Sequence, residues 1–146
     1  MATWAEFESA EPKFAARVRR LMTSRKHLTM ATLRQDGAPR ISGTEVQFSG
    51  QDLQIGSMPR AVKAMDLIRD GRVAIHGPTN DPSKDGKWRG EAKIAGRAVE
   101  LPRKDDSHFF SIDIEEVVVT GLNQKRDGLK IESWTPGAGY RVRERA

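Results

Sequence analysis

Apolar and polar residues alternate along most of this chain, which is typical of strands with one buried face. The alternation indicates about six to seven strands, among them residues 27–34, 40–48, 53–57, 90–101, 108–122, 129–134 and 140–145. Turn sequences rich in Gly, Pro and Asp separate neighbouring segments, as in hairpins that join antiparallel strands. The pattern therefore predicts a mainly β protein.

Two segments have helical periodicity instead. Residues 10–24 place apolar side chains three or four positions apart, and Ser9 precedes them as a candidate N-cap. Residues 60–69 repeat this spacing, and Gly71 follows as a stop signal. One helix thus precedes the strands and one interrupts them. This order disfavours a doubly wound parallel sheet, in which helices and strands alternate.

The strand alternation changes phase at two glycines. The apolar positions of residues 40–48 switch parity near Gly43, and those of residues 90–101 switch near Gly96. A switch of this kind predicts a bulge, or a close approach of another group to the backbone. Hairpin-joined strands that bend at glycines are typical of small, closed or partly closed antiparallel barrels. We therefore expect an α+β barrel with two short flanking helices.

Size and charge narrow the picture only slightly. The chain has 146 residues and a formal net charge of +5, so we expect one domain over residues 1–146 and an anionic partner of unspecified kind. The sequence contains no cysteine and no apolar run of membrane-spanning length. We therefore expect a soluble cytoplasmic protein.

The sequence contains no motif for side-chain catalysis. Its three histidines lack the spacing of metal ligands, so we predict no metal site. It has no nucleophile elbow, no P-loop and no dinucleotide-binding glycine motif. The sequence thus identifies no catalytic residue, and if the protein is an enzyme, a bound cofactor supplies the chemistry.

One segment nevertheless combines groups that bind anions. Ser57 ends a short strand, and Arg60 and Lys63 lie at the start of the helix that follows. Helix N-termini favour anions because their backbone N–H groups are free and the helix dipole is positive there. The segment is therefore a candidate phosphate site, although a capped surface helix with solvated cations explains the same residues.

Together the segments resemble the pyridoxamine 5'-phosphate oxidase-like family of flavin and deazaflavin oxidoreductases. "HLTMATLRQDGAPRISGTEVQF" resembles the family's first two strands, and "GSMPRAVKAMDLIRDGRVAI" resembles its phosphate-binding strand–helix–strand unit. "GEAKIAGRAVEL" is similar to the long barrel strand, and "IESWTPGAGYRVRER" is similar to the terminal hairpin. Where the best-known members carry Ser-Arg-Lys-Ala, this chain has Ala61, Val62, Lys63 and Ala64.

The resemblance implies an antiparallel split β-barrel that forms a homodimer with two cofactor sites at the subunit interface. By motif, Lys63 binds the flavin phosphate. The other residues that the resemblance places at the cofactor are Ser42, Gly43, Thr44, Ser57, Met58, Arg60, Trp134 and Arg141 or Arg143. Among them, Trp134 approaches the ring from the second subunit. Thr44, Glu45 and Tyr140 are candidates for proton transfer.

The implied cofactor is FMN or the deazaflavin coenzyme F-420, and the implied reaction is hydride transfer with a small planar substrate. Ser42 stands near the place where the oxidases carry a phosphate-binding Arg, which disfavours true pyridoxamine phosphate oxidase activity. Two alternatives stay open: a flavin or haem carrier without turnover, and a basic barrel that binds nucleic acid. Aromatic residues make up only 6% of the chain, which disfavours nucleic acid because single-stranded binding relies on aromatic stacking.

Overall fold

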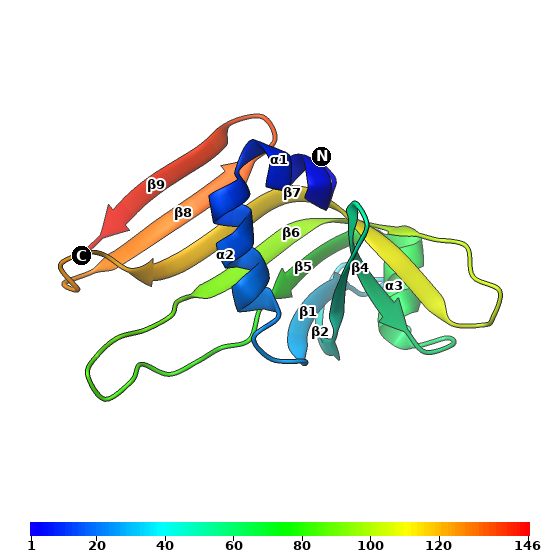
Figure 1. Ribbon diagram of the computed structural model, residues 1–146. Helices are drawn as coiled ribbons and strands as arrows, with labels where there is room; N and C mark the ends of the chain where they lie inside the picture. Colours follow the sequence, from blue (N-terminus) through cyan, green and yellow to red (C-terminus); the bar gives the residue numbers. More distant parts are fainter.

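Nine strands and three helices form the computed structural model, which describes residues 1–146 (Figure 1). The elements in chain order are α1 (Trp4–Ala10), α2 (Pro12–Met22), β1 (Leu28–Leu33), β2 (Pro39–Thr44), β3 (Val46–Ser49), β4 (Asp52–Ser57), α3 (Val62–Arg69), β5 (Arg72–His76), β6 (Glu91–Glu100), β7 (His108–Leu122), β8 (Leu129–Thr135) and β9 (Gly139–Arg145). None of the three helices is long and apolar enough to cross a membrane.

The strands form one antiparallel sheet in the order β2-β1-β5-β6-β7-β4-β3, and β8 and β9 extend from β7. β2 and β3 lie at opposite ends of this order and do not pair, so the sheet is not closed. Only Glu45 separates the two strands in sequence, so the two ends lie close together and the sheet curves into an open barrel. The expected mainly β, antiparallel split barrel is therefore confirmed.

The phase change at Gly96 is a β-bulge, as expected. The register between β6 and β7 shifts between Ala95 and Gly96. A Cβ atom at Gly96 would lie 1.9 Å from the backbone oxygen of Asp113, so only glycine fits at this position.

The phase change near Gly43 has a different cause, and the predicted bulge there is wrong. Gly43 pairs with Thr29 in an unbroken β1–β2 register. Residues 40–48 belong to two strands that separate at Glu45, where the chain leaves β1 and Val46 begins to pair with β4. The apolar positions change parity because the two strands face different partners.

The predicted helix at residues 10–24 is α2, and a further helix that the sequence analysis did not predict, α1, precedes it. Ser9 lies inside α1, so it does not cap α2, whose N-cap Glu11 makes no side-chain capping bond. The capping box belongs to α1, where Thr3 accepts from the Glu6 backbone and the Glu6 side chain accepts from the Thr3 backbone. Figure 1 shows α1 and α2 lying across one face of the sheet.

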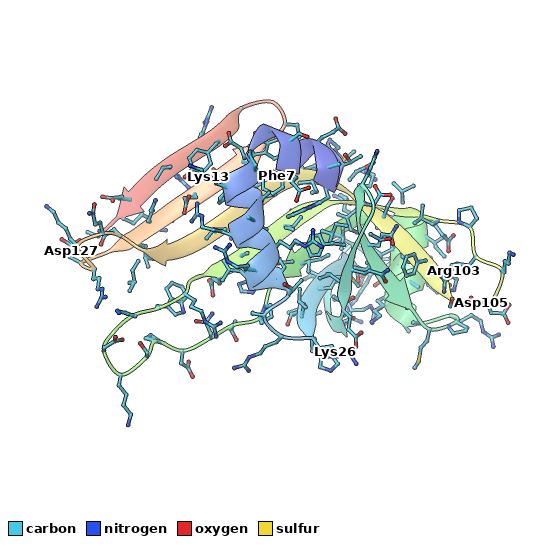
Figure 2. All side chains as sticks on the ribbon, viewed as in Figure 1. Phe7, Lys13, Lys26, Arg103, Asp105 and Asp127 are labelled. Carbon is cyan, nitrogen blue, oxygen red and sulfur yellow. The ribbon has the colours of Figure 1, made fainter.

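Aromatic rings fill the space between these helices and the sheet. Phe7 of α1, which Figure 2 labels, is fully buried and packs against Trp4, Phe14 and Trp134. Trp134 is 5% exposed and belongs to the same core as β6 and β7. Burial of these rings attaches the two helices to the sheet.

Ala2, which precedes α1, forms an isolated antiparallel bridge with Ile114 of β7. Each residue donates its N–H to the other's carbonyl oxygen, at 2.9 and 2.7 Å. The bridge falls between the stretch of β7 that pairs with β4 and the stretch that pairs with β8. One edge of β7 therefore holds three separate segments.

Candidate functional site

A pocket of about 460 Å³ lies at the opening of the barrel, between the end of β2, strands β3 and β4, and the start of α3. We call it the seam pocket. Its lining residues are His27, Gly43, Thr44, Glu45, Val46, Gln47, Gln54, Gly56, Ser57, Met58, Lys63 and Phe109. This volume falls within the range of small-molecule sites.

Lys63 connects the two sides of the seam pocket. It is the second residue of α3, and its Nζ donates a hydrogen bond to the Gly43 carbonyl oxygen of β2 at 2.7 Å. An ammonium group has three donors, so two remain for a ligand. Sequence reasoning placed Lys63 at a phosphate and Gly43 along a ring, and the two residues meet here.

The first backbone donors of α3 are also free. The N–H groups of Val62 and Lys63 have no acceptor within the chain, because the first N–H groups of a helix have no helical carbonyl before them. The first helical bonds run from the N–H groups of Ala64 and Met65 to the Ala61 carbonyl oxygen. Ala61 offers no side-chain cap, so these N–H groups point out of the helix start unsatisfied. The start of α3 therefore offers donors suited to an anion, and Lys63 is the residue among them that lines the seam pocket.

The loop that leads into α3 has an unusual backbone. Arg60 precedes the N-cap, so α3 does not begin at Arg60 as the sequence suggested. Its φ of 56° lies in the left-handed region, which non-glycine residues rarely adopt. Met58 and Ser57 line the seam pocket, whereas the Arg60 side chain does not.

A buried carboxylate fixes α3 against β1 and β2. Asp66 is 2% exposed, and it accepts hydrogen bonds from Thr32 Oγ1 at 2.8 Å, Arg40 Nε at 2.7 Å and Arg69 Nη2 at 3.2 Å. Burial raises the pKa of Asp66, but the bonds from Arg40, Thr32 and Arg69 outweigh it and hold the pKa below its ordinary value. The carboxylate therefore stays charged and keeps Lys63 in place.

Two glycines shape the walls of the seam pocket. A Cβ atom at Gly43 would meet only the Leu28 carbonyl oxygen, at 4.0 Å, so this wall faces open space. Gly56 instead lies under the Phe109 ring, which a Cβ would approach to 3.2 Å. The Arg103 guanidinium lies 4.7 Å from the centre of that ring. Figure 2 labels Arg103 on the loop between β6 and β7.

His27 and Glu45 line the mouth of the pocket, with the imidazole Nδ1 and a carboxylate oxygen 3.8 Å apart. Sequence reasoning considered Glu45 but gave no role to His27 or Phe109. His27 lies just before β1, and Phe109 lies about eighty residues away on β7. Only the closure of the barrel brings them together, so no local pattern signals either residue.

Trp134 and Arg141 lie far from the seam pocket of their own chain. Ser57 pairs with His108, whereas Trp134 pairs with Val117, nine residues further along β7. At about 3.3 Å per residue the two places are about 30 Å apart along the strand. A contribution from Trp134 or Arg141 to a cofactor site requires a second copy of the chain. The Trp134 side chain is buried within its own chain, so little of its surface is left to contact a cofactor in a second copy.

Two further candidates also lie outside the pocket lining. Ser42 of β2 pairs with Met30 of β1 and does not line the pocket. The Tyr140 hydroxyl donates to the Glu132 carboxylate, which also forms an ion pair with Arg17. Burial and the bond to Glu132 raise the pKa of Tyr140 to about 12. Tyr140 therefore ties β9 to α2 rather than facing the seam.

No protein-family model and no curated protein sequence matches the chain. Solved structures do match. A pyridoxamine 5'-phosphate oxidase-related, FMN-binding protein from Nostoc punctiforme PCC 73102 superposes with a TM-score of 0.67 and 10% identity, over 93% of this chain and 96% of the other.

Two further structures match nearly as well. A heme-binding protein from Mycobacterium smegmatis matches with a TM-score of 0.61 and 13% identity, over 88% of this chain and 86% of the other. PhzG from Burkholderia lata 383, in complex with tetrahydrophenazine-1-carboxylic acid, matches with a TM-score of 0.62 and 13% identity, over 92% and 86%. At this level of identity the similarities establish the fold.

Proposed function

We propose that this chain, which has the split-barrel fold of pyridoxamine 5'-phosphate oxidase-related, FMN-binding proteins, binds a phosphorylated flavin in the seam pocket and serves as an oxidoreductase. FMN is the proposed cofactor, and the deazaflavin coenzyme F-420 is the alternative with the same anchoring chemistry. The observation that carries the proposal is the cluster of free donors at the start of α3, where Lys63 meets Gly43.

The residues of the pocket suit such a ligand. The N–H groups of Val62 and Lys63, the Lys63 ammonium and the Ser57 hydroxyl would bind the phosphate. The open wall at Gly43 leaves room for a flat ring against β2. When bound, FMN supplies a ring that accepts or donates a hydride.

The chain's own contribution is to bind and orient the cofactor. Asp66 holds α3, and with it Lys63, against the sheet. His27 and Glu45 at the mouth of the pocket are titratable groups within reach of a bound substrate. Positioning of this kind lowers a reaction barrier by reducing the entropy lost in reaching the transition state.

A second copy of the chain completes the proposed assembly. The exposed side of α3 carries Val62, Met65 and Ile68, and the loop before α3 carries Met58, which is 80% exposed. These four residues, which we call the apolar α3 surface, adjoin the seam pocket through Met58. Exposed apolar residues gathered beside a site are typical of protein interfaces, and we assign this surface to a homodimer.

Binding measurements on the purified protein test the cofactor proposal. FMN should bind, and Lys63→Ala should weaken FMN binding about 10- to 100-fold, because a hydrogen bond to a charged group contributes about 1.5–3 kcal/mol. The same substitution should weaken the binding of riboflavin, which lacks the phosphate, much less than the binding of FMN. Lys13, labelled on α2 in Figure 2 and far from the seam, provides the matched control Lys13→Ala.

Three results would count against the proposal. The first is that FMN and coenzyme F-420 both fail to bind. The second is that Lys63→Ala and Lys13→Ala affect FMN equally. The third is that added hemin binds in place of either flavin, which would favour the haem-carrier alternative.

A further inference from the structure

The left-handed backbone of Arg60 requires something to hold it. With φ at 56°, this residue is one of two non-glycine residues in the chain with positive φ. Such a conformation is unfavourable for a residue with a Cβ atom, so it persists only where neighbouring groups fix it. Arg60 follows Ser57 and Met58, which line the seam pocket, and directly precedes Ala61, the N-cap of α3. The loop 57–61 therefore sets where the free donors of α3 point.

His108 holds this loop. The Arg60 N–H donates a hydrogen bond to His108 Nε2 at 3.2 Å, and His108 Nδ1 lies 2.9 Å from Glu100 Oε2. A backbone amide can only donate, so Nε2 must be unprotonated and Nδ1 must carry the proton that Glu100 accepts. The His108 side chain is only 17% exposed. The observed geometry thus requires neutral imidazole in one tautomer.

We propose that His108, oriented by Glu100, is a positioning residue that keeps the loop 57–61 in its anion-binding shape, and that protonation of His108 releases the loop and weakens phosphate binding. The proposal rests on the proposed function, because it concerns the same phosphate site. On protonation, Nε2–H would face the Arg60 N–H, and two donors would meet without an acceptor. The contact with Glu100 would survive.

The groups around His108 carry charges of both signs. The Glu100 carboxylate on β6 lies 2.9 Å from Nδ1, and Arg60 contacts Nε2 through its backbone N–H. The hollow that contains His108 is also lined by Arg103, Asp105 and Asp106 from the loop between β6 and β7. Arg103 lies 3.8 Å from Asp105, so part of its charge is already compensated.

The effect reaches the phosphate site through short covalent and hydrogen-bonded links. His108 pairs with Ser57 in the β4–β7 register, and it also holds Arg60, three residues later. Ala61 follows directly and begins α3, whose next two residues carry the free N–H groups. Release of Arg60 would leave the loop held at its two ends, Ser57 and α3, and by the bond from the Ala61 N–H to the Met58 carbonyl oxygen. The N–H groups at the start of α3 would then be less firmly oriented.

The first experiment needs no ligand. The amide signal of Arg60, followed by NMR between about pH 8 and pH 5.5, should shift with the titration of the His108 ring. In His108→Gln the side-chain carbonyl keeps an acceptor near the Nε2 position, so the Arg60 signal should lose its pH dependence. His76→Gln on β5 is the matched control and should behave like the wild type.

The second experiment measures FMN affinity in the same three proteins. Lowering the pH should weaken binding to the wild type and to His76→Gln by about three- to tenfold more than to His108→Gln, the effect of one hydrogen bond. FMN's own phosphate titrates identically in all three proteins, so the comparison removes its contribution.

The outcomes separate the two proposals. Equal pH dependence in the wild type and His108→Gln, with an Arg60 signal that ignores His108, would overturn the role of His108 and leave the cofactor proposal intact. A complete absence of FMN binding at both pH values would instead overturn the proposed function, and with it the pH effect on affinity. The Arg60 signal would still report whether His108 holds the loop.

Discussion

At the scale of single residues, the candidate site depends on hydrogen-bond donors that have no acceptor within the chain, at the start of α3. The motif alone placed Lys63 and Gly43 at the phosphate and the ring, and the structure joins them by a hydrogen bond. His27 and Phe109 were beyond prediction because they come from distant parts of the chain and meet only at the seam. Sequence patterns report local periodicity, and a site built across a barrel opening has none.

Gly43 provides a test at this scale. In Gly43→Val the new Cβ atom meets no atom closer than the Leu28 oxygen, so stability should change little, while FMN affinity should fall about tenfold or more from the loss of pocket space. Fluorescence titration and thermal melts measure the two quantities.

Gly121→Val provides the control, because Gly121 also has open space around it and lies at the other end of β7. Unchanged FMN affinity in Gly43→Val would show that the ligand does not lie against β2.

At the scale of elements, the strands were predictable and the helix starts were not. Alternation located the segments that became β1, β4 and β6, since burial on one face imposes a period of two. Helix α1 was not predicted, although Pro12 signals the boundary after it, because a proline disfavours a helical backbone at the residue before it, here Glu11. The separation of β2 from β3 escaped because a change of strand partner leaves only a parity switch.

The attachment of α3 depends on Asp66, and this gives a prediction for stability. Asp66→Asn should lower the free energy of unfolding by about 1.5–3 kcal/mol at neutral pH, because three hydrogen bonds to a charged group are weakened. The pKa of Asp66 is lowered by folding. Its contribution is therefore complete above the ordinary aspartate pKa and is lost as the pH falls through the lower folded-state value.

Denaturant unfolding of the wild type and Asp66→Asn at neutral and strongly acidic pH measures this effect. The difference in the free energy of unfolding between the wild type and Asp66→Asn should become smaller in acid. Asp70→Asn is the control, because Asp70 pairs with Arg72 at the surface and should cause a smaller change. A difference that stays constant down to strongly acidic pH would contradict the assigned role.

At the scale of the whole molecule, the chain leaves an apolar surface uncovered beside the seam pocket. The helices α1 and α2 cover the other side of the barrel, so no part of this chain reaches the apolar α3 surface. The distance of Trp134 and Arg141 from the seam leads to the same conclusion, since any role for them at the cofactor needs a partner subunit.

Light scattering on the purified protein tests this assembly. The wild type should be a dimer, and Ile68→Glu should shift it toward monomer, because burying one isoleucine side chain contributes about 1.5–3 kcal/mol. Val99→Glu places the same charge on an exposed apolar site of β6 outside the apolar α3 surface, and it should leave the dimer intact. A monomeric wild type, or dissociation in both variants alike, would contradict the assignment.

The bridge between Ala2 and Ile114 has a consequence for how the chain folds during synthesis. The segment around Ala2 finds its strand partner only after β7 has been translated, on the order of ten seconds later at ordinary elongation rates. Until then α1 cannot dock on the completed sheet, and its aromatic side chains stay exposed. The segment that carries α1 is thus made well before the strand that it pairs with.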